Sequence, residues 1–403
     1  MMFTPDLAGQ SWLSAADTAR LARYRQYLAF DAGRHEIGRL GSGGAPLVAN
    51  YARTFIRKGV AYLMPGAVLP AVEPPDDTPA GVAVAERATR LLAATAADND
   101  LALVDLAAAT DTGVLGDGAF KVTWDAGTSR VRVVPADVGT LFVETAPDNA
   151  RRVVAVRQIA HLPATAVRDR YGVTPTGSNA THAAVRETWT ADTYTVAVDD
   201  VPAHDGPNPY GVIPYVIFPN TPRPHDFWGE SDLVDLMDVN RALDRRLSVL
   251  AQVLELSGNP VTVLENVGAA QGISVAPGAV WELPPQSRAY LLDLLAGGGV
   301  ETHLRFIEVL YRIMHDLAEM PRSAFGDSSG VTSGTALRAT LQPLLQRTQR
   351  KRLIWTAALS RRATLTLALA ARFGGFDPGP YDPDALPVRV PWPPIIETAA
   401  DSQ

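Results

Sequence analysis

The clearest chemical motif in the chain is the pentapeptide Gly326-Asp327-Ser328-Ser329-Gly330, which matches the G-x-S-x-G pattern of serine hydrolases. In those enzymes the serine occupies a strained turn between a buried strand and a helix. Here the preceding residues, HDLAEMPRSAF, are typical of a helix that ends at Pro321. We therefore interpret the motif as a flexible Ser/Gly loop, and a nucleophilic Ser328 is the less favoured alternative.

Other residue types that support catalysis or cofactor binding form no recognisable pattern. The seven histidines are scattered and include no HExxH, and the absence of cysteine excludes disulfides and thiolate metal sites. A phosphate-binding P-loop needs glycine immediately before its lysine, whereas Lys58, Lys121 and Lys351 follow Arg, Phe and Arg. Carboxylates are plentiful, but no spacing favours a metal or acid/base pair. We expect no enzyme activity, no cofactor and no metal site.

Charge is distributed unevenly along the chain. The 403 residues include 36 basic and 43 acidic side chains, yet residues 331–375 contain eight of the cations and no acid. A basic surface on an acidic body can face nucleic acid or an acidic patch of a neighbouring subunit. The eight cations are Arg338, Arg347, Arg350, Lys351, Arg352, Arg361, Arg362 and Arg372.

The composition is that of a soluble globular protein, with 47% hydrophobic and 20% charged residues. No apolar run approaches the roughly 18 to 20 residues that span a bilayer. The first residues, MMFTPDLAGQSWLS, lack the basic start and apolar block of a secretion signal. We expect a soluble intracellular product without a membrane partner.

The first half of the chain is predicted to be an α+β body. Residues 1–110 show mostly helical spacing of apolar residues, and alternating strand-like segments follow, the first two paired around an Asp125-Ala126-Gly127 turn. The segment His204–Gly229 holds six prolines, which predicts an extended crossing and excludes a helix or a central strand. We place the end of this body near Trp228.

A regular helix is predicted after this boundary. It would begin at a Ser231 cap with an acidic first turn and end at Gly258 and Pro260. Its seam alternates four and three residues, which indicates packing inside the core, or else packing against another helix or subunit with Asn240 fixing the register. The seam consists of Leu236, Asn240, Leu243, Leu247, Leu250 and Leu254.

A second helix is predicted at 300–319, and two short strand-like pieces, PVTVLEN and GAVWELPP, lie between the two helices. The pattern therefore indicates a helical hairpin with a small β module at its tip. A third, long helix is expected from a Ser333 cap to the stop at Phe373-Gly374-Gly375, with a kink before Pro343.

This order of elements resembles the portal proteins of tailed double-stranded DNA bacteriophages. The residues that carry the resemblance are NPYGVIPYVIFPN with WGESDLVDLMDVNRALDRRLS, then PGAVWELPP, then LAEMPRSAFGDSSGVTSGTAL leading into the basic helix. The resemblance covers nearly the whole chain and rests on pattern and order. It implies a ring, usually of about twelve copies, at one capsid vertex, through which a separate terminase motor packages DNA that is later ejected.

The resemblance also implies a division of the chain into parts. These are a wing (1–228), a first stem helix (229–257), a clip (258–298), a second stem helix (299–320), a tunnel loop (321–332), a long kinked helix (333–375) and a proline-rich C-terminal segment (376–403) with a crown that is minimal or missing.

The partners implied are further copies of the chain, double-stranded DNA bound without sequence specificity, the terminase large subunit, major capsid and scaffold proteins, and head-completion or tail adaptor proteins. The expected location is the portal vertex of the virion, with the host cytoplasm during assembly. A DNA-binding regulatory protein that uses the basic helix is the main alternative.

Three sets of residues are then candidates for function. The tunnel-loop set, expected to face DNA, is Arg322, Asp327, Ser328, Ser329 and Thr332. An acidic stem face of Asp232, Asp235 and Asp238 would repel phosphates, although these acids could instead only complement a helix N-terminus. The basic set, expected to bridge to neighbouring subunits or to contact DNA, is Arg338, Arg347, Arg350, Lys351 and Arg352.

Overall fold

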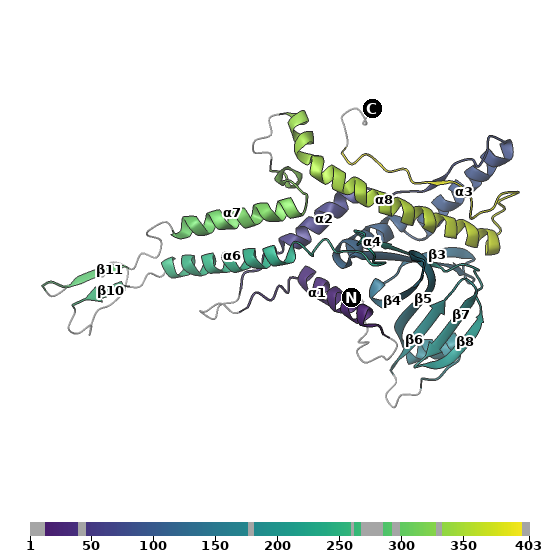
Figure 1. Ribbon diagram of the computed structural model, residues 1–403, viewed down its shortest axis with the longest axis horizontal. Helices are drawn as coiled ribbons and strands as arrows, with labels where there is room; N and C mark the ends of the chain where they lie inside the picture. Colours follow the sequence, from purple (N-terminus) through teal and green to yellow (C-terminus); the bar gives the residue numbers. More distant parts are fainter. Residues whose placement is uncertain are drawn as a thin grey trace.

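The protein is elongated, with an α+β body from which two helices project side by side toward a small β-hairpin (Figure 1). The computed structural model describes residues 13–38, 46–175, 181–258, 262–266, 285–291, 299–327 and 333–396. Its mixture of helix and sheet confirms the α+β class expected from the sequence.

Four helices form the N-terminal part of the body, as the apolar spacing predicts. They are α1 (Ala15–Asp31), α2 (Tyr51–Leu63), α3 (Pro79–Asp98) and α4 (Leu101–Leu115). The first three start at side-chain caps, because Ser14, Asn50 and Thr78 each accept a hydrogen bond from an N–H of the first turn. Local sequence therefore defines where these helices begin.

Two antiparallel sheets complete the body. The first has the order β3-β2-β9, and its strands are β2 (Asp117–Asp125), β3 (Arg130–Pro135) and β9 (Tyr215–Pro219). The second has the order β4-β5-β6-β7-β8, and its strands are β4 (Leu141–Ala146), β5 (Asn149–Pro163), β6 (His182–Trp189), β7 (Thr193–Val198) and β8 (Val201–Pro207).

The pairing of β2 with β3 confirms the hairpin expected around Asp125-Ala126-Gly127. The proline-rich stretch supplies β9, which is an edge strand, and this placement agrees with the exclusion of a central strand. Shorter elements connect these parts: η1 (Val138–Thr140), α5 (Ala164–Tyr171), and β1 (Ala71–Val72), which pairs with β12 (Val388–Arg389) near the C-terminus.

The projection consists of α6 (Met237–Gly258) and α7 (Gly299–Leu317), which pack along each other. At the far end β10 (Thr262–Glu265) pairs antiparallel with β11 (Arg288–Leu291). This arrangement confirms the predicted helical hairpin and the strand within PVTVLEN. Its partner β11 follows the expected GAVWELPP piece, of which residues 278–284 lie outside the described residues. Most of the expected clip lies outside the described residues.

The start of α6 differs from the prediction. Residues 232–236 form turns, and the helix begins at Met237. Ser231 is buried, and its hydroxyl donates to the carbonyl oxygen of Val114 at 2.5 Å, so it ties the chain to the end of α4 and does not cap α6.

The long helix α8 (Gly334–Phe373) crosses the body, as Figure 1 shows. Ser333 accepts from the N–H of Ala336 and Gly374 follows the last turn, which confirms the predicted ends. Pro343 lies inside the helix, and the first turns run in a different direction from the rest (Figure 1). After α7, the short helix η2 (Arg322–Phe325) leads toward α8. No helix in the described part of the chain is long and apolar enough to cross a membrane.

The core of the body contains a buried ion pair between α8 and α4. Arg362 and Asp105 form a two-pronged contact, with one N–O distance of 3.0 Å, and the guanidinium carbon lies 4.6 Å from the centre of the Phe120 ring. Their side chains are 3% and 6% exposed. Because neither charge reaches water, each depends on the other for its solvation.

We expect Arg362→Leu to lower the free energy of unfolding by about 3–5 kcal/mol, because it leaves the Asp105 carboxylate buried without a partner. Urea denaturation at pH 7 measures this change. The matched control is Arg361→Leu at the adjacent, exposed position, where a change within about 0.5 kcal/mol is expected. Equal losses of stability in the two variants would contradict a stabilising role for the buried pair of Arg362 and Asp105.

Candidate functional site

The most elaborate polar region is the place where α6 and α7 join the body. Two clusters meet there. The base cluster consists of Asn220, Asp232, Arg347 and Lys351, and the strap cluster consists of His35, Asn240, Asp244 and Ser248. Together they determine how the helical pair is held.

The base cluster is centred on the carboxylate of Asp232, just before α6. Lys351 Nζ lies 2.5 Å from its Oδ2, Arg347 Nη2 lies 2.9 Å from its Oδ1, and Asn220 Nδ2 donates to Oδ1 at 2.9 Å. The three charged side chains are 11–14% exposed. Burial by itself would raise the pKa of Asp232, but Arg347 and Lys351 outweigh it and hold that pKa well below its usual range.

For the pKa of Lys351, the effect of burial outweighs the effect of the neighbouring charge. Burial lowers the pKa of its ammonium group, and the neighbouring Asp232 carboxylate offsets only part of that effect. Asn220 Oδ1 also accepts from Lys351 Nζ at 2.7 Å. The lysine therefore depends on this single carboxylate and amide for its place in the interior.

The same stretch of α8 also holds the end of α7. Arg347 Nη1 donates to the carbonyl oxygen of Ala318 at 2.6 Å, and Arg350 pairs with Glu319 at 2.5 Å. Ala318 is buried just past the last turn of α7, where orphan carbonyls favour a cation. One face of α8 thus binds the base ends of both projecting helices.

For Arg347, Lys351 and Arg352, these contacts correct the expectation that the basic helix faces DNA or a neighbouring subunit. Arg347, Arg350 and Lys351 pair within the chain, and Arg352 is buried, donates to the carbonyl oxygen of Pro393 at 2.7 Å and lies 4.8 Å from the Trp392 ring centre. The reason is that α8 carries no acid, so its inward-facing cations pair with acids and carbonyls of the elements packed against it. Arg350 remains 57% exposed, so its pair with Glu319 lies at the surface. Arg338, near the start of α8, is exposed.

The structure contradicts the expectation of an exposed acidic stem face for one of its three residues. Asp232 is buried in the base cluster and cannot line a channel. Asp235 and Asp238 are exposed, and Asp238, with a side chain 92% exposed, pairs with Arg241 at 2.7 Å. Only these two acids keep the exposure that the hypothesis requires.

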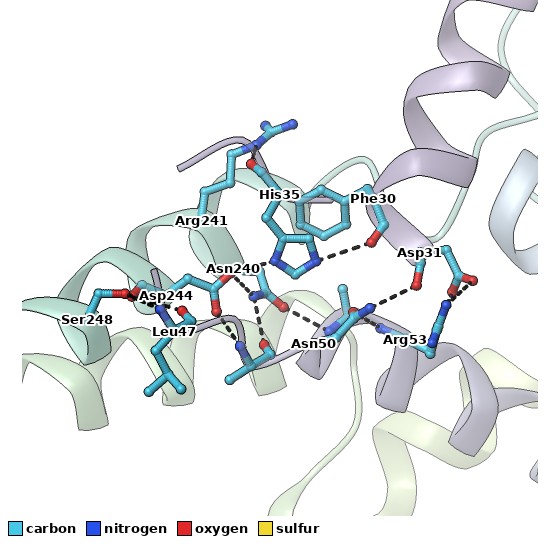
Figure 2. A network of polar contacts seen from close by, with 12 residues as sticks. Phe30, Asp31, His35, Leu47, Asn50, Arg53, Asn240, Arg241, Asp244 and Ser248 are labelled. Atoms are coloured by element: carbon cyan, nitrogen blue, oxygen red, sulfur yellow. Dashed lines mark hydrogen bonds and ion pairs between the residues drawn. The ribbon is translucent and has the colours of Figure 1, made fainter. Parts of the chain in front are cut away.

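The strap cluster joins α6 to the first turn of α2 and to the segment just before it (Figure 2). Asn240, Asp244 and Ser248 are four residues apart, so they stack on one face of the helix. Their side chains bind backbone groups, because the N–H groups of Ala52, Ala49 and Leu47 donate to Asn240 Oδ1, Asp244 Oδ1 and Ser248 Oγ at 2.9, 2.8 and 2.9 Å respectively. Asn240 Nδ2 also donates to the carbonyl oxygen of Ala49 at 3.0 Å.

His35 lies inside the same cluster and is fully buried (Figure 2). Its Nδ1 is 2.5 Å from Asp244 Oδ2 and its Nε2 is 3.2 Å from the carbonyl oxygen of Phe30. The imidazole stacks on the Phe30 ring with 3.9 Å between the centres. Arg241 Nε donates to the carbonyl oxygen of His35 at 3.0 Å, so two side chains of α6, Arg241 and Asp244, bind this histidine.

Asn240 joins α6 to another helix of the chain, because its Oδ1 accepts from the N–H of Ala52 in the first turn of α2 and its Nδ2 donates to the carbonyl oxygen of Ala49 just before that helix. A role for Asn240 in fixing the helix register stays a prediction. The rest of the seam is covered only near the base: Leu236 and Leu243 are buried, Leu247 and Leu250 are half-buried, and Leu254 is 52% exposed. The repeat of Asn240, Asp244 and Ser248 at four-residue intervals is the signal that could have revealed the strap cluster.

Of the tunnel-loop set, Arg322 and Asp327 are described. Arg322 opens η2, and its guanidinium carbon lies 5.0 Å from the centre of the Tyr311 ring. Ser328, Ser329 and Thr332 lie outside the described residues. Gly326 follows η2 and not a buried strand, so the segment before the G-x-S-x-G motif lacks the strand that a nucleophile elbow requires.

A second feature missed from the sequence is an apolar stripe on α7, which we call the α7 ridge. It consists of Phe306, Val309, Ile313 and Leu317, which are 42%, 43%, 38% and 44% exposed. Their spacing of three and four residues places them along one face of α7, while Leu310 and Met314 face the protein. Contiguous exposed apolar side chains of this kind usually mark a contact with another molecule.

Comparison of the chain with known proteins does not indicate a function. No protein-family model matches the chain, and no curated protein matches its sequence. Within the described ranges, no group of three or more histidines or acids could hold a metal ion. The function is therefore inferred from the base cluster, the strap cluster and the α7 ridge.

We expect Asp232→Asn to lower the free energy of unfolding by about 3–5 kcal/mol at pH 7, because two buried cations lose their counter-charge. The lowered pKa means that Asp232 stabilises the fold above the usual pKa of an aspartate and progressively less as the pH falls below about 4. The stability difference between the two proteins, measured by urea denaturation, should therefore narrow as the pH falls from 4 to 3. The exposed control Asp238→Asn should change stability by less than about 1 kcal/mol, and an equal loss in both variants would contradict the role of Asp232.

Asn240→Leu distinguishes the strap contacts from a helix–helix seam. A seam position would gain stability from leucine, whereas loss of the contacts to Ala49 and Ala52 should destabilise the protein by about 2–4 kcal/mol. Thermal and urea unfolding measure the change, and Ala251→Leu, at an exposed position of the same helix, serves as control. A more stable Asn240→Leu variant would refute the strap interpretation.

Proposed function

We propose that this chain is the subunit of a portal-type ring through which double-stranded DNA is packaged into a capsid and later released. The observation that carries the proposal is the helical pair α6/α7, which is anchored at its base and tipped by a β-hairpin (Figure 1). The pair also bears the partly exposed α7 ridge. This arrangement agrees with the order of wing, stem, clip, second stem and long helix that the sequence suggests.

The α7 ridge supports self-association. Apolar side chains at three-to-four spacing form the rows by which helices pack on one another. The four side chains of this row are 38–44% exposed, although the Arg246 guanidinium lies 5.4 Å from the centre of the Phe306 ring. A contact of the ridge with a different face of the next copy would be heterologous, and such contacts yield either closed rings or open filaments. A closed ring would bury the ridge in every subunit.

The charges suit a channel in which DNA slides. Each phosphate neutralised by a cation adds affinity, and strong static binding would oppose movement. Arg347, Lys351 and Arg352 are occupied within the chain, while Asp235 and Asp238 are exposed at the base of the pair. We propose that these two acids face the channel and that the segment between α7 and α8 reaches toward DNA.

The proposed partners follow from this placement. The tip of the helical pair would meet the terminase large subunit and, after packaging, head-completion or tail adaptor proteins, while the wing would meet capsid and scaffold proteins. The proposed location is the portal vertex of a virion. Arg347 and Lys351 turn inward and leave fewer cations for a DNA-binding regulator, and η2 before Gly326 disfavours a serine hydrolase.

Native mass spectrometry of the purified chain and of Ile313→Glu tests the proposal. We expect the unaltered chain to form a species of roughly half a megadalton, which corresponds to about twelve copies of 43.0 kDa, and the variant to remain small because a carboxylate interrupts the ridge. Glu308→Gln, at an exposed position of the same helix, is the control and should still assemble. Equal masses for the chain and Ile313→Glu would contradict assembly through the ridge.

A further inference from the structure

A groove of about 650 Å³ lies between β5, β9 and α8. Val153 and Val156 of β5 line one side, and Ile354 and Ala357 of α8 line another. The groove is open to solvent and largely apolar. None of the contacts of the base or strap cluster uses these four side chains, so the groove is separate from the site described above.

The strand β9 presents its free edge to this groove. It is the last strand in the order β3-β2-β9, and every residue from Tyr215 to Pro219 lines the groove. Successive side chains of a strand point to opposite faces, so only an edge brings all of them to one groove.

The hydrogen-bond register identifies which backbone groups are free. The N–H of Val122 donates to the carbonyl oxygen of Pro214, and that of Asn220 donates to the carbonyl oxygen of Gly116, so even-numbered residues of β9 bond to β2. The N–H and C=O groups of Tyr215 and Ile217 therefore point away from β2. Among the described residues, no backbone group or side chain forms a hydrogen bond with these four groups.

Unpaired backbone groups beside an apolar groove favour an extended partner. Tyr215 is only 7% exposed, and backbone polar groups in such surroundings are almost always paired. A strand laid along β9 would supply both donors and acceptors, as in β-augmentation. On the β5 side the pairing with β6 begins only at Val156, so the groove is not closed by a neighbouring strand.

The charges beside the groove indicate which kind of partner would bind there. Arg151 and Arg361 line it, and both side chains are exposed. No acid of the described chain forms an ion pair with either of them. A strand with apolar residues at alternate positions and carboxylates between them would match both the apolar wall and the cations.

We propose that this groove binds an extended acidic and apolar segment of another protein, which adds a strand to the free edge of β9. The β8 edge of a second copy is a poorer occupant, because β8 contains Pro202 and Pro207 and its pairing with β7 has a register shift after Val196. Proline and irregular pairing blunt an edge against further strands. The proposal does not depend on ring formation.

Fluorescence anisotropy with a labelled hexapeptide of alternating Glu and Val tests the proposal. We expect saturable binding that weakens by about tenfold when the backbone nitrogens facing β9 are methylated, and by a similar factor when lysine replaces glutamate. Arg361→Glu should weaken binding of the acidic peptide by about tenfold, and Ala357→Trp should block the groove. Arg338→Glu, on the same helix and outside the groove, is the control and should bind normally.

The unfolding midpoints of all variants are compared first, so that only folded proteins enter the titration. Absence of saturable binding to the unaltered protein would overturn the proposal, and so would equal binding of the methylated peptide. If Ala357→Trp or Arg361→Glu instead alters the native mass of the chain without affecting peptide binding, the groove is a contact between copies and the proposed occupant is wrong.

Discussion

The placement of the helical pair depends on the ion pairs that the buried Asp232 carboxylate forms with Arg347 and Lys351. A charge removed from water must keep its partners close, and Arg347 and Lys351 supply them from adjacent turns of α8. Because Arg347 also binds the carbonyl oxygen of Ala318, the same turns of α8 hold the start of the α6 segment and the end of α7. The two helices therefore cannot slide at their base without breaking a buried charge contact.

The strap cluster adds a second attachment further along α6, where Asn240, Asp244 and Ser248 bind the backbone of the first turn of α2 and of the segment before it. The side chains of both clusters point into the protein. The α7 ridge, Asp235 and Asp238 stay exposed. The projection is thus anchored on one side and open on the other. This is the distribution that the proposed ring requires, with the apolar stripe available to a neighbour and the acids available to a channel.

The elements were predictable from the sequence because their signals are local. Ser333 and Gly374 bound α8, and apolar periodicity identifies α6 and α7. The partners of charged residues were not predictable, since Asp232 and Lys351 are 119 positions apart and Asn240 and Ala52 are 188 apart. A count of charges along α8 shows an excess of cations but carries no information on which distant groups satisfy them.

Single-particle electron microscopy of the assembled chain tests the central claim most directly, because it shows where the helical pair lies in the assembly. The account predicts a closed ring in which α6 and α7 of every subunit surround a central channel, the α7 ridge is covered by the next copy, and Asp235 and Asp238 face the lumen. An open filament, or a ring with the helical pair on its outer surface and the ridge exposed, would contradict it.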